Sequence, residues 1–362
     1  MKKKQTNSTT SGKGRKYNQK FKSLVVYQIL QRLTDEEHSI STGEIRDELA
    51  MNYDIEAERK SIISDLKELQ NLFDYELDND GLREHVDFGY EVVEDEEYIN
   101  GQSKKWYLNR PYTTDQLKLM IECINANKSI SESDAKEVRD IVYRMTSEKQ
   151  MEYLESNSQV VGRLNINKGF VYSISVINEA IKNNKKIHFF YLKRDWNDKT
   201  KSIRRNNGLK HIVSPYYITI NDGFYYVVCV SEHNTITNYR IDRMESVKIF
   251  EEEDRTGKEL IDELGDINNY VLTSFNMFGG EKKEVKIWFS DRMLDTVIER
   301  FGTKKNTKYE KQDDGFVITT DIWVSEKFFA WLIGFGENAK LLGPKEEVKK
   351  MKAFLKKISS NY

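Results

Sequence analysis

Apolar residues in the first third of the chain recur at helical spacing, with polar breaks between the runs. Ser41-Thr42 has the residue types of a helix N-cap, and Ile62, Leu66 and Leu69 form the inner stripe expected of a longer helix. The pattern predicts helices over 21–33, from Ser41-Thr42 to Leu49, and over 56–70, and then a hairpin of two short strands around 92–93 and 106–108.

The middle of the chain changes from helical spacing to short β-rich runs. Residues 113–155 predict two helices, and a third begins at residue 171. Asn221-Asp222-Gly223 separates two β-rich runs, which is a strong hairpin signal. Several short strands at close spacing favour a small barrel. The strands are expected over 187–191, 212–220, 224–230, 235–244 and 247–250, with a basic, Asn-rich loop at 193–210.

The C-terminal part alternates strands and helices after a mixed stretch, 251–282, that we interpret as a connection. In the last helix Val348, Met351, Leu355 and Ile358 form one apolar face, and Pro344 suits its first position. The predicted order is a strand over 285–289, a helix over 292–301, strands over 307–312 and 316–323, a helix over 327–333, a strand over 339–342 and a helix over 344–358.

Composition narrows the class of protein. The chain has 362 residues, 38% of them hydrophobic and 32% charged, and at about 100–200 residues per domain it should hold two or three domains. No apolar run approaches the roughly 18 residues of a membrane span, and the polar N-terminus does not have the pattern of a signal peptide. The only cysteines are Cys123 and Cys229, which excludes a disulfide framework, so we expect a cytoplasmic protein.

The near-zero net charge of -2 hides strong local patterning. Residues 1–22 carry eight Lys or Arg and no acid, whereas residues 74–97 carry eleven acids against Arg83 alone. A basic tail points to a polyanionic partner, although a tail that only aids solubility has the same composition. Residues 1–20 are also too poor in apolar side chains to fold by themselves, so we expect them to be disordered.

The sequence contains no pattern of an enzyme. Phosphate-loop, HExxH and GxSxG motifs are absent. The five histidines are scattered, without the spacing of a zinc site. We therefore expect no catalytic residues, no metal and no cofactor.

The three N-terminal helices have the order of a helix-turn-helix. With Ile62 at the centre of the buried face of the third helix, the opposite face is small and basic enough to enter a major groove. Ile63 lies near its edge, where it can touch a thymine methyl group. An ordinary solvated helix face is the alternative. The residues on that outer face are Glu56, Ala57, Lys60, Ser64 and Lys67.

Aromatic and guanidinium groups recur together in the barrel region. Tyr225-Tyr226-Val227 and the run from Tyr239 to Arg243 place tyrosines beside arginines, a combination that can stack on bases and pair with phosphate. Core tyrosines and surface ion pairs are the alternative, with Asp242 neutralising Arg240. Strand alternation puts Arg240 and Arg243 on opposite faces unless the strand ends near Asp242.

Several motifs together resemble the WYL-domain transcriptional regulators of bacteria. The stretch from Tyr53 to Leu66 resembles their helix-turn-helix. Ser214-Pro215-Tyr216, Phe224-Tyr225-Tyr226-Val227 and Tyr239–Met244 resemble the WYL module, in which the Trp-Tyr-Leu triplet reads Tyr225-Tyr226-Val227 here. The motifs that resemble the C-terminal extension called WCX are Met277-Phe-Gly-Gly-Glu281, Glu299-Arg-Phe-Gly302 and Phe328-Phe-Ala-Trp-Leu332.

The resemblance implies an α+β multidomain protein. Its parts would be a winged helix-turn-helix, a helical linker, an Sm-like small β-barrel (WYL) and a ferredoxin-like C-terminal domain (WCX). The expected boundaries are a disordered basic tail at 1–20, the DNA-binding domain at 21–110, the linker at 111–170, the WYL domain at 171–252, a connection at 253–282 and the WCX domain at 283–362.

The function implied is a homodimeric, ligand-responsive transcriptional regulator that binds double-stranded DNA and senses a nucleotide or a single-stranded nucleic acid. The alternative is a single-strand-binding accessory of a defence or repair system without operator specificity. The family's groove maps onto Tyr191, His211, Ser214, Tyr226, Arg240 and Arg243, and Arg204 and Arg205 of the basic loop join them as ligand contacts. The expected DNA contacts are Lys16, Lys20, Lys22, Thr42, Glu56, Arg59, Lys60, Ser64, Lys67, Lys104 and Lys105.

Overall fold

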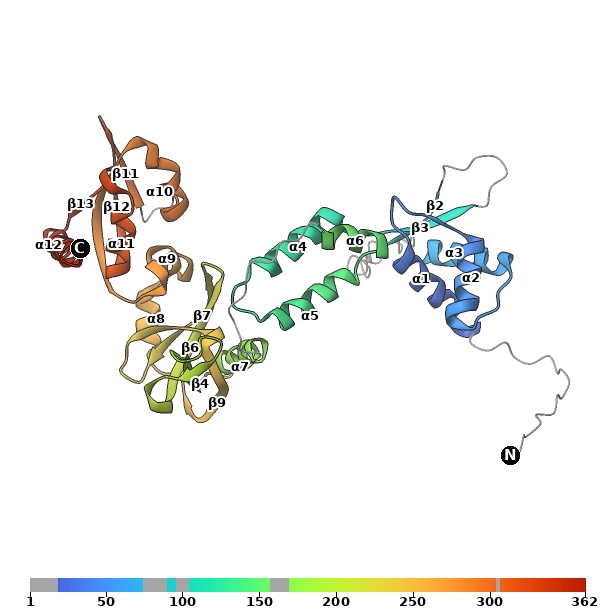
Figure 1. The fold of residues 1–362 in the computed structure, drawn as a ribbon, viewed down its shortest axis with the longest axis horizontal. Helices are drawn as coiled ribbons and strands as arrows, with labels where there is room; N and C mark the ends of the chain where they lie inside the picture. Colours follow the sequence, from blue (N-terminus) through green and yellow to red (C-terminus); the bar gives the residue numbers. More distant parts are fainter. Residues whose placement is uncertain (1–18, 74–89, 96–103, 157–168, 304–306) are drawn as a thin grey trace, which may run out of the picture. The chain divides into compact units, whose positions relative to one another are not determined.

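The structure is a computed structural model that describes residues 19–73, 90–95, 104–156, 169–303 and 307–362. The chain divides into two compact units (Figure 1). The N-terminal unit comprises Met1–Ala126 with Ala135–Val161, and the C-terminal unit comprises Asn127–Asp134 with Gly162–Tyr362. The fold class is mixed α+β, as the sequence predicts. The expected tail, Lys16 within it, and most of the acidic stretch 74–97 lie outside the described residues.

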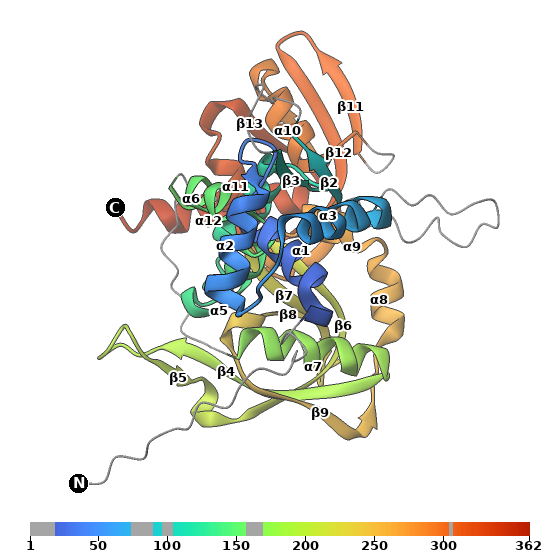
Figure 2. The same ribbon diagram turned by 90° about the vertical axis from the view of Figure 1, so that its right-hand side faces the viewer.

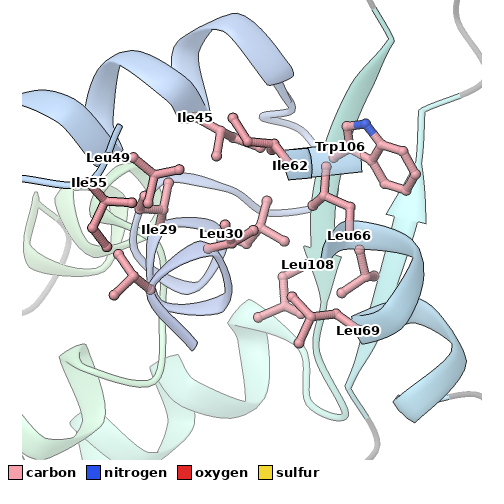
Figure 3. Close-up of a cluster of buried hydrophobic side chains, with 13 residues drawn as sticks. Ile29, Leu30, Ile45, Leu49, Ile55, Ile62, Leu66, Leu69, Trp106 and Leu108 are labelled. Atoms are coloured by element: carbon pink, nitrogen blue, oxygen red, sulfur yellow. The ribbon is translucent and has the colours of Figure 1, made fainter. Parts of the chain in front are cut away.

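The N-terminal unit starts with three helices that enclose one apolar core (Figure 3). Ile29 and Leu30 of the first helix meet Ile45 of the second and Ile62 of the third, and all four side chains are buried. Trp106 closes the core from a small antiparallel sheet of order β1-β3-β2. The elements are α1 (Lys22–Leu33), β1 (Ile40–Ser41), α2 (Thr42–Tyr53), α3 (Arg59–Phe73), β2 (Glu91–Glu94) and β3 (Lys105–Asn109).

The turn between α2 and α3 differs from the prediction. Ser41 caps α2 in a capping box with Glu44, but the helix continues past Leu49 to Tyr53. Asp54 then adopts a left-handed conformation with φ of 53°, and the Ile55 N–H bonds back to Leu49 O at 2.9 Å. This turn takes up the residues expected to begin the third helix. Helix α3 therefore starts at Arg59, and Glu56 and Ala57 precede it.

A second group of helices follows, and it has one member more than predicted. These helices are α4 (Thr114–Ala126), α5 (Glu132–Tyr143) and α6 (Glu148–Ser156). Arg110 fastens the group to the first core, since its buried guanidinium donates to the carbonyls of Gln31, Thr34 and Met145. A buried guanidinium that is paired with carbonyl dipoles is costly to move, so this junction is firmly specified.

The C-terminal unit opens with helix α7 (Phe170–Lys182), which lies against a strongly curved antiparallel sheet (Figure 1). The sheet has the order β5-β4-β6-β7-β8, and β9 also pairs with β4. The hairpin at Asn221-Asp222-Gly223 is confirmed, with left-handed φ angles of 51° at Asp222 and 79° at Gly223. The strands are β4 (Lys185–Arg194), β5 (Ser202–Arg204), β6 (Lys210–Asn221), β7 (Phe224–Ser231), β8 (Ile236–Arg240) and β9 (Met244–Asp254).

Two predictions for this sheet are wrong in detail. The strand expected over 235–244 stops at Arg240, where a 3-10 turn of Ile241–Arg243 follows. The stretch expected as a loop at 193–210 contains strand β5, which pairs with the end of β4, and a 3-10 turn over Asn206–Gly208. Strand β5 and the two 3-10 turns have three residues each, which is too short for a periodic pattern, and β5 is also mostly polar.

The stretch interpreted as a connection also contains two helices, α8 (Lys258–Leu264) and α9 (Ile267–Thr273). Tyr270 and Met277 of this stretch pack on Val228 and Val230 of β7 in one buried cluster. These helices therefore cover one face of the sheet rather than only joining two domains. Each has seven residues, fewer than two turns, which is too few for an amphipathic pattern to stand out.

The last domain follows the predicted order closely. Its antiparallel sheet has the order β11-β12-β10-β13, with an aromatic core that includes Phe289, Phe316 and Phe328. The elements are β10 (Glu281–Phe289), α10 (Leu294–Phe301), β11 (Thr307–Gln312), β12 (Gly315–Val324), α11 (Glu326–Ile333), β13 (Ala339–Gly343) and α12 (Lys345–Ser359).

Helix α12 is rotated relative to the predicted apolar face. Pro344 is its N-cap rather than its first residue. Val348 and Met351 contact the core as expected, but Leu355 and Ile358 are exposed, and the Glu347 carboxylate is buried instead. Lys350 donates to Glu347 at 2.8 Å, and this ion pair compensates for the burial of the charge.

Candidate functional site

The outer face of α3 carries three of the eleven predicted DNA contacts. Lys60, Ser64 and Lys67 are exposed, as is Arg59 at the start of the helix, while Ile62 and Leu66 point into the core. Ile63 is half-buried at the edge of this face. The face is therefore basic and accessible over two turns, a property that entry into a DNA groove requires.

Lys22 is not available for a phosphate contact, contrary to the prediction. Its ammonium group forms an ion pair with Asp65 of α3 at 2.6 Å, and the two side chains are only 8% and 9% exposed. It also donates to the Ser61 carbonyl at 3.2 Å. Lys22 therefore ties α1 to α3, because removing its partner would leave a charge buried without compensation.

The other predicted contacts of this domain divide into accessible and inaccessible groups. Thr42 is 1% exposed inside the first turn of α2, so its side chain is not accessible for a DNA contact. Glu56 is exposed but lies in the turn before α3 rather than on the outer helix face. Lys20 is exposed, and at β3 so are Lys104, which forms an ion pair with Glu94, and Lys105.

In the C-terminal unit, four rings gather inside the curved sheet. Phe189 stacks on His211 with centroids 5.4 Å apart, and Tyr239 meets Phe189 edge-on at 5.1 Å. Tyr191 contacts Tyr239 at 5.2 Å. Burial lowers the pKa of His211 and raises that of Tyr239 to about 12, so both rings are neutral near pH 7. We call this cluster of four mutually contacting rings the aromatic wall.

Tyr191 links this wall to the arginines. Its hydroxyl accepts a hydrogen bond from the Arg240 N–H at 3.2 Å, and the Arg205 guanidinium lies 5.4 Å from its ring centroid. Burial raises the pKa of Tyr191, while that N–H and the charge of Arg243 act in the opposite direction. Tyr191 therefore lies where the end of β8 and two guanidinium groups converge.

Arg240 lies opposite Tyr226 on the neighbouring strand, so the two side chains share one face of the sheet. The guanidinium stacks on Phe224 at 3.4 Å and forms two hydrogen bonds to Asp242, of 3.0 Å and 2.7 Å. The sequence interpretation in which Asp242 neutralises Arg240 is thus confirmed. Asp242 can do so because β8 ends at Arg240, and the following turn brings the carboxylate back beside it.

The predicted ligand residues consequently lie on two faces that meet at the end of β8. Tyr191 and His211 belong to the face of Tyr239, whereas Tyr226 and Arg240 belong to the opposite one. Ser214 pairs with Val230 and so shares the face of Tyr226, but its side chain is engaged within the protein. It is buried, and its hydroxyl accepts the Thr256 N–H at 2.9 Å, which fastens the chain after β9.

Sequence reasoning missed a segment that the structure places against this site. Residues 127–134, hereafter the strap, comprise the loop after α4 and the first residues of α5, and they belong to the C-terminal unit. The Lys128 N–H bonds to Gly223 O at 2.9 Å, and the Ser129 hydroxyl accepts the Tyr225 N–H at 2.7 Å. Both contacts are made to the hairpin that holds Phe224. A loop between two helices carries no pattern that would indicate such an attachment.

Within the described ranges, no group of three or more His, Cys, Asp or Glu side chains could hold a metal ion. No helix in those ranges is both long and apolar enough to cross a membrane.

Comparison with known proteins assigns two of the domains. The WYL domain family matches residues 173–249, and the WCX domain family matches residues 281–359. No curated protein matches the chain significantly in sequence.

Two solved structures similar to the chain are distant from it. Proteasome accessory factor B/C (PafBC) of Arthrobacter aurescens is 14% identical with a TM-score of 0.27, and a CRISPR Cas-related protein is 12% identical with a TM-score of 0.33. The matches cover 97% and 95% of this chain, and 50% and 81% of the other proteins, so the chain spans half the length of the PafBC chain. On the two domain matches, the chain is a WYL-domain protein that also carries a WCX domain.

Proposed function

We propose that this protein is a dimeric, ligand-responsive DNA-binding regulator. In this proposal the N-terminal unit holds a winged helix-turn-helix with α3 as recognition helix. The WYL domain is an Sm-like barrel that senses the ligand, and the WCX domain is ferredoxin-like. The observation that carries the proposal is the occurrence, in one chain, of a WYL domain and a three-helix unit that exposes Lys60, Ser64 and Lys67 on one helix face.

The DNA contact follows from the shape and charge of α3. Its inner face is fixed by the buried Ile62 and Leu66, and by the ion pair of Asp65 with Lys22. The outer face therefore has a defined direction. Lys60 and Lys67 lie two turns apart on it and supply positive charge at both ends. Lys20 and Lys105 are further accessible cations for phosphate contacts.

The ligand site follows from the charges around Tyr191. Arg205 and Arg243 lie near this ring. Arg240, whose N–H bonds to the Tyr191 hydroxyl, forms an ion pair with Asp242. An anionic, flat ligand such as a nucleotide could stack on the aromatic wall while its phosphate competes with Asp242 for Arg240. Such competition would alter the hydrogen bonds of the turn that follows β8.

The strap offers a physical route from that turn to the DNA-binding part. Arg240 stacks on Phe224, and Lys128 lies 5.8 Å from the same ring. A ligand that releases Arg240 would therefore disturb the hairpin to which the strap is bound. Since the strap continues directly into α4 and α5, a shift of the hairpin would bias these helices. A ligand can do this only by binding one arrangement more tightly than the other.

A second copy of the chain is the proposed partner of the helical part. Leu119 and Met120 of α4, and Val138 and Ile141 of α5, are large apolar side chains that remain exposed. Large exposed apolar side chains are candidates for burial against a partner. A dimer would also present two α3 helices, as the reading of paired half-sites requires.

The test is protection of genomic DNA fragments by the purified protein, followed by titration of any protected site. The proposal predicts protection of one short, near-palindromic duplex. It also predicts that Lys60→Gln with Lys67→Gln weakens binding and lowers the salt slope by about one for each phosphate that the protein no longer neutralises. Lys349→Gln with Lys352→Gln, two exposed lysines of α12, is the matched control. A preference for single strands of any sequence over every duplex would refute the regulator and favour the accessory protein.

A further inference from the structure

Helices α1, α5 and α6 of the N-terminal unit, all labelled in Figure 2, surround a cavity with a volume of about 530 Å³. This size lies within the range of pockets that hold small molecules. Every residue that lines the cavity belongs to the N-terminal unit, so no residue of the proposed ligand site around Tyr191 contributes to it. None of the side chains predicted to bind DNA lines it either. The cavity is therefore a second candidate site.

Polar contacts between the helices hold the walls of the cavity in place. On α1, the Arg32 guanidinium donates to Glu148 of α6 at 2.9 Å and to Glu48 of α2 at 2.6 Å, so its charge is already compensated. At the turn between α5 and α6, the buried hydroxyl of Ser147 donates to the buried carboxylate of Asp35. Because α1 is joined in this way to α6 and to the turn before it, the cavity is largely preformed.

Charges of both signs line the cavity without compensation. Asp140, Arg144 and Glu155 form no ion pair with any residue that the structure describes. The Arg144 N–H bonds to Asp140 O at 3.2 Å, so these two residues lie one helical turn apart. Asp and Arg at this spacing commonly attract one another on a helix, yet here the two side chains stay apart. Two carboxylates and one guanidinium are thus left for a ligand.

Tyr143 of α5 supplies an aromatic ring beside the two carboxylates. Burial has the largest effect in raising the pKa of its hydroxyl, the charge of Glu155 adds to this rise, and Asp140 acts in the same direction against Arg139. Glu155 of α6 and Asp140 of α5 therefore both lie within electrostatic range of this one side chain. Met151 of α6 also lines the cavity. An aliphatic chain can pack on the ring and the thioether, and a cation beside the ring is stabilised.

We propose that this cavity binds a basic amino acid, a ligand with two cationic groups, one carboxylate and an aliphatic chain between them. The free charges of the lining match this ligand one for one. Arg144 takes the ligand carboxylate, and Asp140 and Glu155 take the two cations. The aliphatic chain packs on Tyr143 and Met151. The site goes beyond the proposed function and does not depend on it, because a bound ligand would join α1 of the three-helix unit to α5 and α6 without involving the WYL domain.

The experiment is isothermal titration calorimetry of the full-length protein with L-lysine. The comparison ligands are 1,5-diaminopentane, which lacks the carboxylate, and L-norleucine, which lacks the second ammonium group, and we expect L-lysine to bind more tightly than either. Asp140→Asn or Glu155→Gln should weaken L-lysine binding by about 5- to 13-fold, between the effect of an exposed ion pair and that of a hydrogen bond to a charged group. Arg144→Gln should weaken L-lysine binding similarly without weakening that of diaminopentane. Glu152→Gln, on α6 but outside the lining, is the matched control.

Hydrogen exchange locates the bound ligand, since L-lysine should slow exchange in peptides from α1, α5 and α6 of the wild type. Diaminopentane binding as tight as that of L-lysine would overturn the assignment of a basic amino acid. No binding of any of the three ligands, or equal L-lysine affinity in Asp140→Asn, Glu155→Gln and the control, would overturn the site itself. Duplex protection plays no part in these measurements, so the proposed regulator and this site can fail independently of one another.

Discussion

The hydroxyl of Ser129 provides a sharp test of the route from ligand site to DNA. It is fully buried and accepts the Tyr225 N–H at 2.7 Å in a part-buried hydrogen bond, so Ser129→Ala leaves that donor without this acceptor. A hydrogen bond of this kind contributes about 0.5–1.5 kcal/mol. This corresponds to a change of about 2- to 13-fold in the equilibrium between attached and detached strap.

Hydrogen exchange followed by mass spectrometry measures that equilibrium. Peptides that contain the Tyr225 amide, and those from the ends of α4 and α5 next to the strap, should exchange faster in Ser129→Ala. Peptides from α3 should not change, because this helix is held by its own core. Ser175→Ala on the exposed side of α7 is the control, since its hydroxyl bonds only within the helix, to Val171 O.

The same variant should uncouple ligand from DNA. With a 15-mer of deoxythymidylate as a single-stranded ligand, the ratio of duplex affinities measured with and without ligand should move towards one in Ser129→Ala, while affinity for the 15-mer is retained. Unchanged exchange at Tyr225 would show that the hydrogen bond does not hold the strap. Faster exchange with an undiminished affinity ratio would show that the strap does not carry the signal.

Three further predictions concern single side chains. Asp65→Asn should lower the free energy of unfolding by about 3–5 kcal/mol in urea titration, because Lys22 is left buried and unpaired, and Lys22→Met with Asp65→Leu should recover most of it. Arg240→Ala should abolish the ligand response but leave DNA binding without ligand intact, and a surviving response would place the site elsewhere. Because burial lowers the pKa of His211 from 6.5, the unfolded chain binds a proton more readily, so stability should fall as pH falls through and below 6.5. His211→Phe should flatten this dependence in thermal melts, and an unaltered slope would exclude His211 as its source.

The fold was largely predictable where long elements have a regular apolar pattern. The C-terminal strands and helices fall within a few residues of their predicted positions, because each buries alternate or helically spaced side chains in one aromatic core. Prediction was poorer where an element is short. Strand β5 and helices α8 and α9 have three to seven residues, and their burial depends on partners distant in sequence.

Prediction of the site residues depended on what fixes each side chain. The outer face of α3 follows from helical geometry once Ile62 is placed inside. The burial of Lys22 could not be predicted, because its partner Asp65 lies 43 positions further along the chain and no local sequence pattern pairs the two residues. Ser214 occupies a position that the family resemblance assigns to the groove. A resemblance transfers a position but not its surroundings, and here Thr256 takes up the hydroxyl.

The strap also bears on how this chain can be divided. Eight residues of the C-terminal unit, Asn127–Asp134, lie between stretches of the N-terminal unit, so no single cut yields two complete parts. A fragment that begins at Gly162 would expose the hairpin backbone groups that bond to Lys128 and Ser129. The complementary fragment would keep the strap but lack the hairpin that the strap binds. Proteolytic dissection of this protein should therefore give fragments less stable than either unit within the intact chain.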